Sequence, residues 1–265
     1  MNVYRHELKW CRKAASGWTL ALSAIAAAML AMYPSFAKEA EALRVMLSTM
    51  PEEMLKAFGV ELDSIASLVG FYSYIFLYVS LCGAIQAMHL GASILSKETR
   101  EKTADFLLVK PVSRGSVALS KILAALTVLV STNAVYMAAA GGMAQAVRTE
   151  PFDAAAFYLI SFSLLLIQLI FLSLGLAAAM LFPRMKSVLP VSLGGVFGFF
   201  ALGMIASSAG DGAMRALTPL YYFDRAYTIA RHGYEPEYLA LGGAVALLCT
   251  AFAYWRYVTR DVYVG

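Results

Sequence analysis

Six long apolar stretches constrain the fold of this chain more than any other feature of its sequence. A helix needs about 20 mostly apolar residues to cross roughly 30 Å of hydrocarbon. Stretches of this length lie at Gly17–Phe36, Ala66–Leu95, Leu119–Ala146, Ala154–Phe182, Val188–Ser207 and Tyr238–Tyr257. Only 14% of the residues are charged, whereas soluble domains carry about 25%. The sequence therefore predicts an all-α polytopic membrane protein, built as one transmembrane domain over residues 1–265, and excludes a soluble enzyme.

Lysine and arginine residues are distributed unevenly between the two sides of the predicted bundle. If the spans alternate from a cytoplasmic N-terminus, about 14 of the 21 basic residues fall on the cytoplasmic side. This bias predicts that both termini lie in the cytoplasm, and we expect a multi-pass protein of the plasma (inner) membrane. The first stretch also has features of a signal peptide, but an uncleaved span is preferred because the rest of the chain is apolar as well.

Four segments outside the spans differ in character. Residues 1–16 are basic and predict an amphipathic helix at the inner surface, with Trp10 facing lipid. Residues 37–65 form an acidic outer segment, and residues 97–118 form a charged cytoplasmic loop. Residues 208–237 form an outer segment rich in Tyr and Phe, which suit the membrane–water boundary. No basic–aromatic run suggests nucleic acid as a partner.

The sequence lacks the motifs of enzymes that work in or on membranes. It has no phosphate-binding Gly-x-x-x-x-Gly-Lys-Ser/Thr loop, no His-Glu-x-x-His and no Gly-x-Ser-x-Gly. Its three histidines fall in different regions of the predicted topology. We therefore expect no catalytic residue, cofactor or metal in this chain. The spans also lack ionisable groups well inside them, so the energy for any transport would come from elsewhere.

A few uncharged or weakly basic polar residues remain within the spans. They either line a path or hydrogen-bond a neighbouring helix, and the second is the commoner fate of such residues. These residues are Gln86, His89, Asn133 and Gln168. In the fifth span, Gly194 and Gly198 have the small-xxx-small spacing that allows a close helix contact, within the chain or between subunits.

The cytoplasmic loop 97–118 carries four consecutive apolar residues, Phe106 to Val109, on the water side of the membrane. It begins as a charged continuation of the second span, and Thr103 suits the cap of a short helix. Pro111 would end that helix, and Ser113 would cap the third span. The apolar residues would lie on the membrane surface, fold back among helix ends, or fill a groove in a soluble partner.

The run from Glu98 to Lys121 resembles the signature of the ATP-binding-cassette (ABC) type-2 permease family. Those permeases carry a Glu, a Thr, a Leu-Leu pair, a Pro with Arg shortly after, and a Lys at the start of the next span. The matching residues here are Glu98, Thr103, Leu107, Leu108, Pro111, Arg114 and Lys121. Lys102 stands where the family often has Gly, a departure that bears on the local turn alone.

Three further segments are similar to those of the same family. Residues 50–59 are similar to the outer segment after the first span, and residues 218–224 to a Pro-aromatic-Asp segment before the last span. Residues 257–262 are similar to a closing basic-Asp signature. Together with the six spans, these segments extend the resemblance over most of the chain.

The resemblance implies an exporter in which two permeases, identical or related, pair in the lipid membrane. Two separate ABC ATPase subunits, which would hold the ATP and Mg, would dock beneath them. The loop after the second span would be the coupling helix, residues 1–16 an elbow helix, and the short helices of 208–237 would partly re-enter the outer leaflet. The implied ATPase-coupling residues are Glu98, Glu101, Thr103, Phe106, Leu107, Leu108, Pro111 and Arg114.

Two other functions stay open at this stage. A non-transporting scaffold or sensor subunit coupled to an ATPase would have the same sequence features. A membrane enzyme is disfavoured, because no nucleophile–base or metal spacing is present. The apolar spans mildly favour lipids, peptides or amphipathic drugs over small ions as substrates.

Overall fold

The computed structural model describes residues 3–47, 54, 67–101, 113–182, 185, 187–209 and 212–259. Within these ranges the chain is helical and has no strand. The helices are α1 (Val3–Leu30), α2 (Tyr33–Leu47), α4 (Leu68–Glu101), α6 (Arg114–Val147), α7 (Ala154–Leu181), α8 (Leu189–Ala209), α9 (Gly212–Ala216), η1 (Pro219–Tyr221), α10 (Arg225–Arg231) and α11 (Pro236–Thr259).

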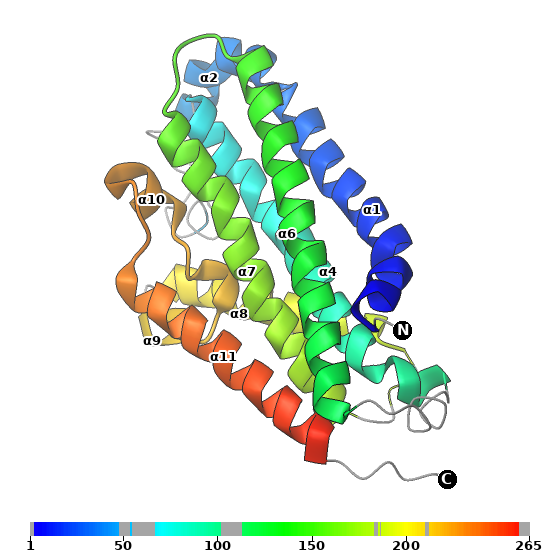
Figure 1. Cartoon of the computed structure of the whole chain (residues 1–265). Helices are drawn as coiled ribbons and strands as arrows, with labels where there is room; N and C mark the ends of the chain where they lie inside the picture. The colour runs from blue at the N-terminus through cyan, green and yellow to red at the C-terminus, as the bar shows by residue number, and fades with distance from the viewer. Residues whose placement is uncertain are drawn as a thin grey trace.

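The six predicted spans are confirmed as helices. Six helices are long and apolar enough to cross a membrane: α1 with the start of α2, then α4, α6, α7, α8 and α11. Alternation places the start of α1, the end of α4, the start of α6 and the end of α11 at one end of the bundle (Figure 1). We call this the basal end.

The first helix differs from the expected division into an elbow helix and a span. α1 runs unbroken from Val3 to Leu30, so residues 1–16 do not form a separate element in the described chain. The physical reason is that the first proline is Pro34, and helix-forming residues fill the positions before it. A turn at residues 31–32 then separates α1 from α2.

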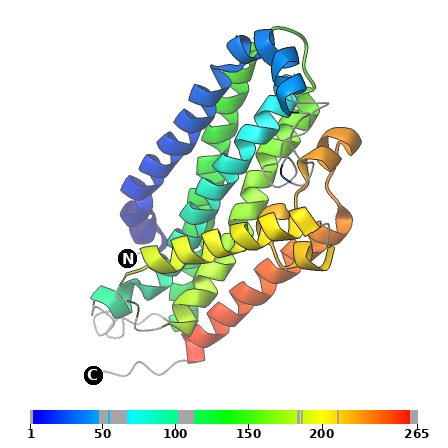
Figure 2. The same ribbon diagram turned by 180° about the vertical axis from the view of Figure 1, so that it is seen from behind.

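The fold is built around α4 and α7, which lie side by side in the middle of the bundle (Figures 1 and 2). Two glycines bring their backbones together. A Cβ atom on Gly91 would lie within van der Waals overlap of the Leu172 carbonyl oxygen, and one on Gly175 within overlap of the Met88 carbonyl oxygen. Because only glycine lacks that atom, this crossing requires glycine on both helices.

The other helices surround this central pair. α1 packs along α6 on one side, and α11 packs along α7 on the other. α8 crosses the face of α4 at a steep angle to the remaining spans (Figure 2). α1, α8 and α11 therefore present broad apolar surfaces outward, as expected of helices that face lipid.

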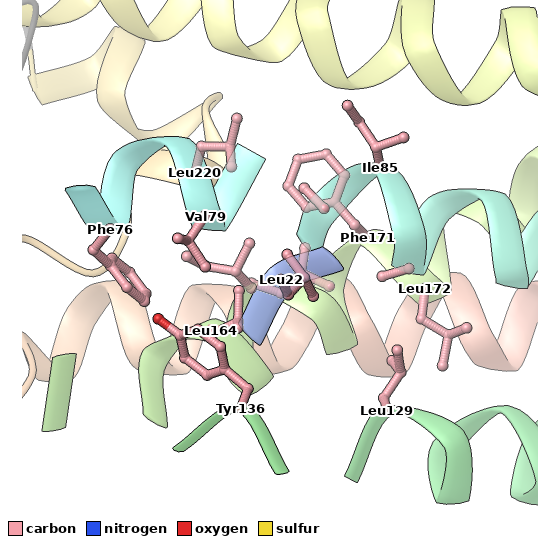
Figure 3. Close-up of a cluster of buried hydrophobic side chains, with 14 of the residues drawn as sticks. Leu22, Phe76, Val79, Ile85, Leu129, Tyr136, Leu164, Phe171, Leu172 and Leu220 are labelled. Atoms are coloured by element: carbon pink, nitrogen blue, oxygen red, sulfur yellow. The ribbon is translucent and has the colours of Figure 1, made fainter. Parts of the chain in front are cut away.

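Among the short elements between α8 and α11, η1 packs into the bundle against α4, α7 and α8. Leu220 of η1 is buried and joins the same apolar cluster as Val79 of α4 and Leu164 of α7 (Figure 3). Val79 and Leu164 lie more than two turns from the ends of their helices, so η1 lies beside the interior of α4 and α7 and not beyond their ends.

Candidate functional site

Three of the four polar candidates meet in one buried layer that joins the central helices. Asn133 of α6 donates from Nδ2 to Oε1 of Gln168 on α7 at 2.5 Å. Gln168 donates from Nε2 to Oε1 of Gln86 on α4 at 3.0 Å. All three side chains are fully buried. We call Gln86, Asn133 and Gln168 the amide layer.

Threonine hydroxyls extend the amide layer to the first helix. Gln86 donates from Nε2 to the hydroxyl of Thr132 at 3.4 Å, and that hydroxyl lies 2.9 Å from the hydroxyl of Thr19 on α1. Four of the six spans are thus linked by polar side chains at one depth. His89, the fourth polar candidate, is only partly buried on α4.

A second polar layer joins α4, α6 and α7 nearer the end of the bundle that lies opposite the basal end. The Tyr72 hydroxyl on α4 lies 2.6 Å from the hydroxyl of Tyr136 on α6 and 2.7 Å from that of Ser161 on α7. Ser161 donates its proton to the carbonyl of Phe157 at 2.9 Å. Two separate polar layers therefore hold α4, α6 and α7 together as a unit.

The predicted coupling residues lie mostly outside the described part of the chain. This is so for Thr103, Phe106, Leu107, Leu108 and Pro111. Glu98 and Glu101 belong to the last turn of α4, although their side chains are not described, and Arg114 is the first, partly exposed residue of α6. The helix therefore continues beyond the apolar part of the second span, as predicted.

The predicted cap of the third span is confirmed. The side chain of Ser113 accepts a hydrogen bond from the backbone N–H of Ser116 at 3.2 Å and begins α6. The start of α6, which follows residues 102–112, is thus fixed by local structure.

A buried cluster of charges lies at the basal end, between the helix ends that bracket residues 102–112. Glu7 of α1 is 3% exposed, and its carboxylate lies 3.6 Å from Lys97 Nζ and 3.8 Å from Lys121 Nζ. Lys121 also donates to the carbonyl of Ile94 at 2.6 Å. Lys97 lies over the ring of Trp10, 4.4 Å from its centre. We call Glu7, Lys97 and Lys121 the basal charge cluster.

The segment before α11 is held by a bidentate ion pair between Arg215 and Glu235. Arg215 donates to both carboxylate oxygens of Glu235, at 2.7 and 3.1 Å, and from Nε to the carbonyl of Tyr221 at 3.0 Å. Its guanidinium also lies over the ring of Tyr238 at 4.0 Å. Such planar, two-point pairing fixes orientation as well as distance.

The two glycines predicted to make a helix contact do not make one within the described chain. A Cβ atom on Gly194 or Gly198 would meet nothing within 4 Å. The close contact lies instead at Gly91 and Gly175. Both have a sequence signal of the same kind, since Ala87 precedes Gly91 and Ala179 follows Gly175 by four residues.

Sequence reasoning also missed the importance of Glu7, because one acidic residue among several basic ones has no distinctive spacing. The second polar layer, formed by Tyr72, Tyr136 and Ser161, was missed because Tyr and Ser are common within apolar helices. In both cases the partners come from helices far apart in the sequence.

A bundle of six apolar helices whose polar groups pair with one another inside it defines a polytopic integral membrane protein. The match to a family model identifies the class of membrane protein. The model of the ABC-2 family transporter proteins matches residues 1–262, so the chain belongs to that family, as its sequence motifs indicated. Comparisons with curated proteins and with solved structures gave no match. The protein is therefore a permease of the ABC transporter class, and its family associates with ABC ATPases.

Proposed function

We propose that this permease exports its substrate across the plasma membrane as a dimer with an identical or related permease. Two ABC ATPase subunits, which bind the ATP and Mg, dock against residues 97–118 at the basal end. Both termini then lie in the cytoplasm, as the excess of basic residues on that side indicates.

The observation that carries this proposal is the arrangement of the basal end. α4 continues past its apolar part to Glu101, and α6 begins at Arg114 under a serine cap, so both lead directly into residues 102–112. These two helices are also members of the unit formed by α4, α6 and α7. A force applied to residues 102–112 is therefore delivered directly to helices that form the core of the bundle.

We further propose that the amide layer holds the helices together and does not line the substrate path. Each of its three side chains is buried, and Gln168 joins the other two through its hydrogen bonds with Asn133 and Gln86. A path lined by these amides would require breaking hydrogen bonds that have no replacement in lipid. The path would then form on a surface of the bundle, where a second permease meets the first.

The first experiment is purification of the native complex in mild detergent, followed by measurement of the subunits present. We expect two copies each of permease and ABC ATPase. The double variant F106D/L107D should lose the ATPase, because charged side chains cannot fill an apolar groove. The matched control L217D alters an exposed leucine of the outer segment and should retain it. Retention of the ATPase by F106D/L107D would reject the docking assignment.

Direction and transport need vesicles that contain the complex. An exporter in inside-out vesicles accumulates amphipathic probes in the lumen when ATP is added outside. ATP hydrolysis without movement of lipid, peptide or drug probes would instead favour the scaffold or sensor function.

A further inference from the structure

We infer that Glu7 is a positioning residue that couples movement of the ATPase-docking segment to α1. The inference rests on the proposed function and adds a role for the first helix. Glu7 is the buried carboxylate of the basal charge cluster, and its two lysine neighbours belong to the two helices that lead into residues 102–112.

The connections of the cluster lead to all three helix ends. Lys97 lies in the last two turns of α4 and contacts α1 twice, through Glu7 and through the face of Trp10. Lys121 lies near the start of α6, is fully buried, and ties α6 to α4 through the Ile94 carbonyl. Displacement of either helix end must therefore move an ammonium group that faces the Glu7 carboxylate.

The geometry of the carboxylate also indicates a contact that can tighten. Charge-assisted N–H···O hydrogen bonds measure about 2.7–2.9 Å. The distances to Lys97 and Lys121 are 3.6 and 3.8 Å, and the Glu7 Oε2 atom is buried without a hydrogen-bond partner. A shift of about 1 Å would convert either ion pair into a hydrogen bond. Fully satisfied structural networks do not leave this spare capacity.

A merely structural role explains the charges poorly. Replacing a buried ion pair by packed apolar residues is often neutral or stabilising. α1 is already held to α6 by other contacts, including the hydroxyls of Tyr4 and Thr127 at 2.9 Å and those of Thr19 and Thr132 at 2.9 Å. The cluster adds instead a link from α1 to both ends of one segment.

The test uses the full permease–ATPase complex in vesicles. The three native cysteines are replaced, and a spin label is attached to a single cysteine introduced at a chosen position. One label stands at position 13 on the exposed side of α1, and a reference label stands at position 202 on α8. Spectra are recorded without nucleotide and with ATP and vanadate. In the parent protein we expect both labels to respond.

In E7Q the response of the α1 label should be largely lost, while the α8 label still responds and ATP is still hydrolysed. The exchange variant E7K/K97E retains one carboxylate and two ammonium groups and should restore the α1 response. If E7Q proves unstable, the comparison is made between E7K/K97E, in which the α1 response should be present, and K97E alone, in which it should be lost.

The outcomes separate the two proposals. An unchanged α1 response in E7Q, or no recovery in E7K/K97E, overturns the role of Glu7 and leaves the proposed function standing. Absence of an ATPase, or of any nucleotide response in the parent protein, overturns the proposed function and the inference with it.

Discussion

Replacing Gly91 by alanine tests the close crossing of α4 and α7. The added Cβ atom would lie within overlap of the Leu172 carbonyl oxygen and 3.0 Å from the Leu176 backbone nitrogen. Both neighbours are backbone atoms of a helix, so no side-chain rotation can relieve the overlap. The helices must separate by about 1 Å to reach ordinary contact distance, which removes dispersion contacts along the most buried interface of the fold.

We expect G91A to cost about 2–3 kcal/mol, as overpacking of well-packed interiors does. For a chain of this size, that cost corresponds to a drop of roughly 4–12 °C in melting temperature. The double variant G91A/G175A should cost less than the sum of the single variants, because the first separation already makes room for the second Cβ atom.

The assay is thermal unfolding of purified protein in one detergent, followed by tryptophan fluorescence and by circular dichroism. The matched control is G142A, also within a spanning helix, where a Cβ atom would meet nothing within 4 Å. We expect G142A to be neutral or slightly stabilising, since alanine favours helix more than glycine. Equal melting temperatures for G91A and G142A would refute the account of the crossing.

Three further predictions concern polar contacts. Gln168→Leu should destabilise the fold by about 1–2 kcal/mol, measured by detergent-induced unfolding, because Gln86 and Asn133 each lose their hydrogen bond to Gln168. An increase in stability would contradict this. The hydrogen bond from the backbone N–H of Ala156 lowers the pKa of Asp153, so this carboxylate stabilises the start of α7 above about pH 4 and loses that effect as pH falls through its lowered pKa. The melting temperature of D153N should therefore vary less with pH in acid than that of the parent protein. Parallel pH profiles of the two proteins would count against the cap. Arg215→Lys keeps the charge but loses the two-point pairing with Glu235. It should increase proteolysis of the segment between α8 and α11 without changing ATPase association, and an unchanged digestion rate would show that the pairing is dispensable.

The sequence by itself determined the class of the protein, because the signals for it are local. Length and apolarity decide whether a helix can cross a membrane, and both are read within one stretch of chain. The same holds for the serine cap at Ser113 and for the continuation of α4 beyond its apolar part. The ordered motifs then sufficed to indicate the family that the family model confirms.

Only the tertiary structure decided which residues meet. Polar residues within an apolar span signal that a partner is needed, but not which helix supplies it, so the joining of Gln86, Asn133 and Gln168 could not be read from their spacing. The glycine contacts show the same limit, since several positions share the small-xxx-small pattern, and packing within this chain brings together the helices at Gly91 and Gly175 but not at Gly194 and Gly198. Pairings between helices distant in sequence depend on their rotation and crossing, and these are fixed by the combined packing of the whole bundle.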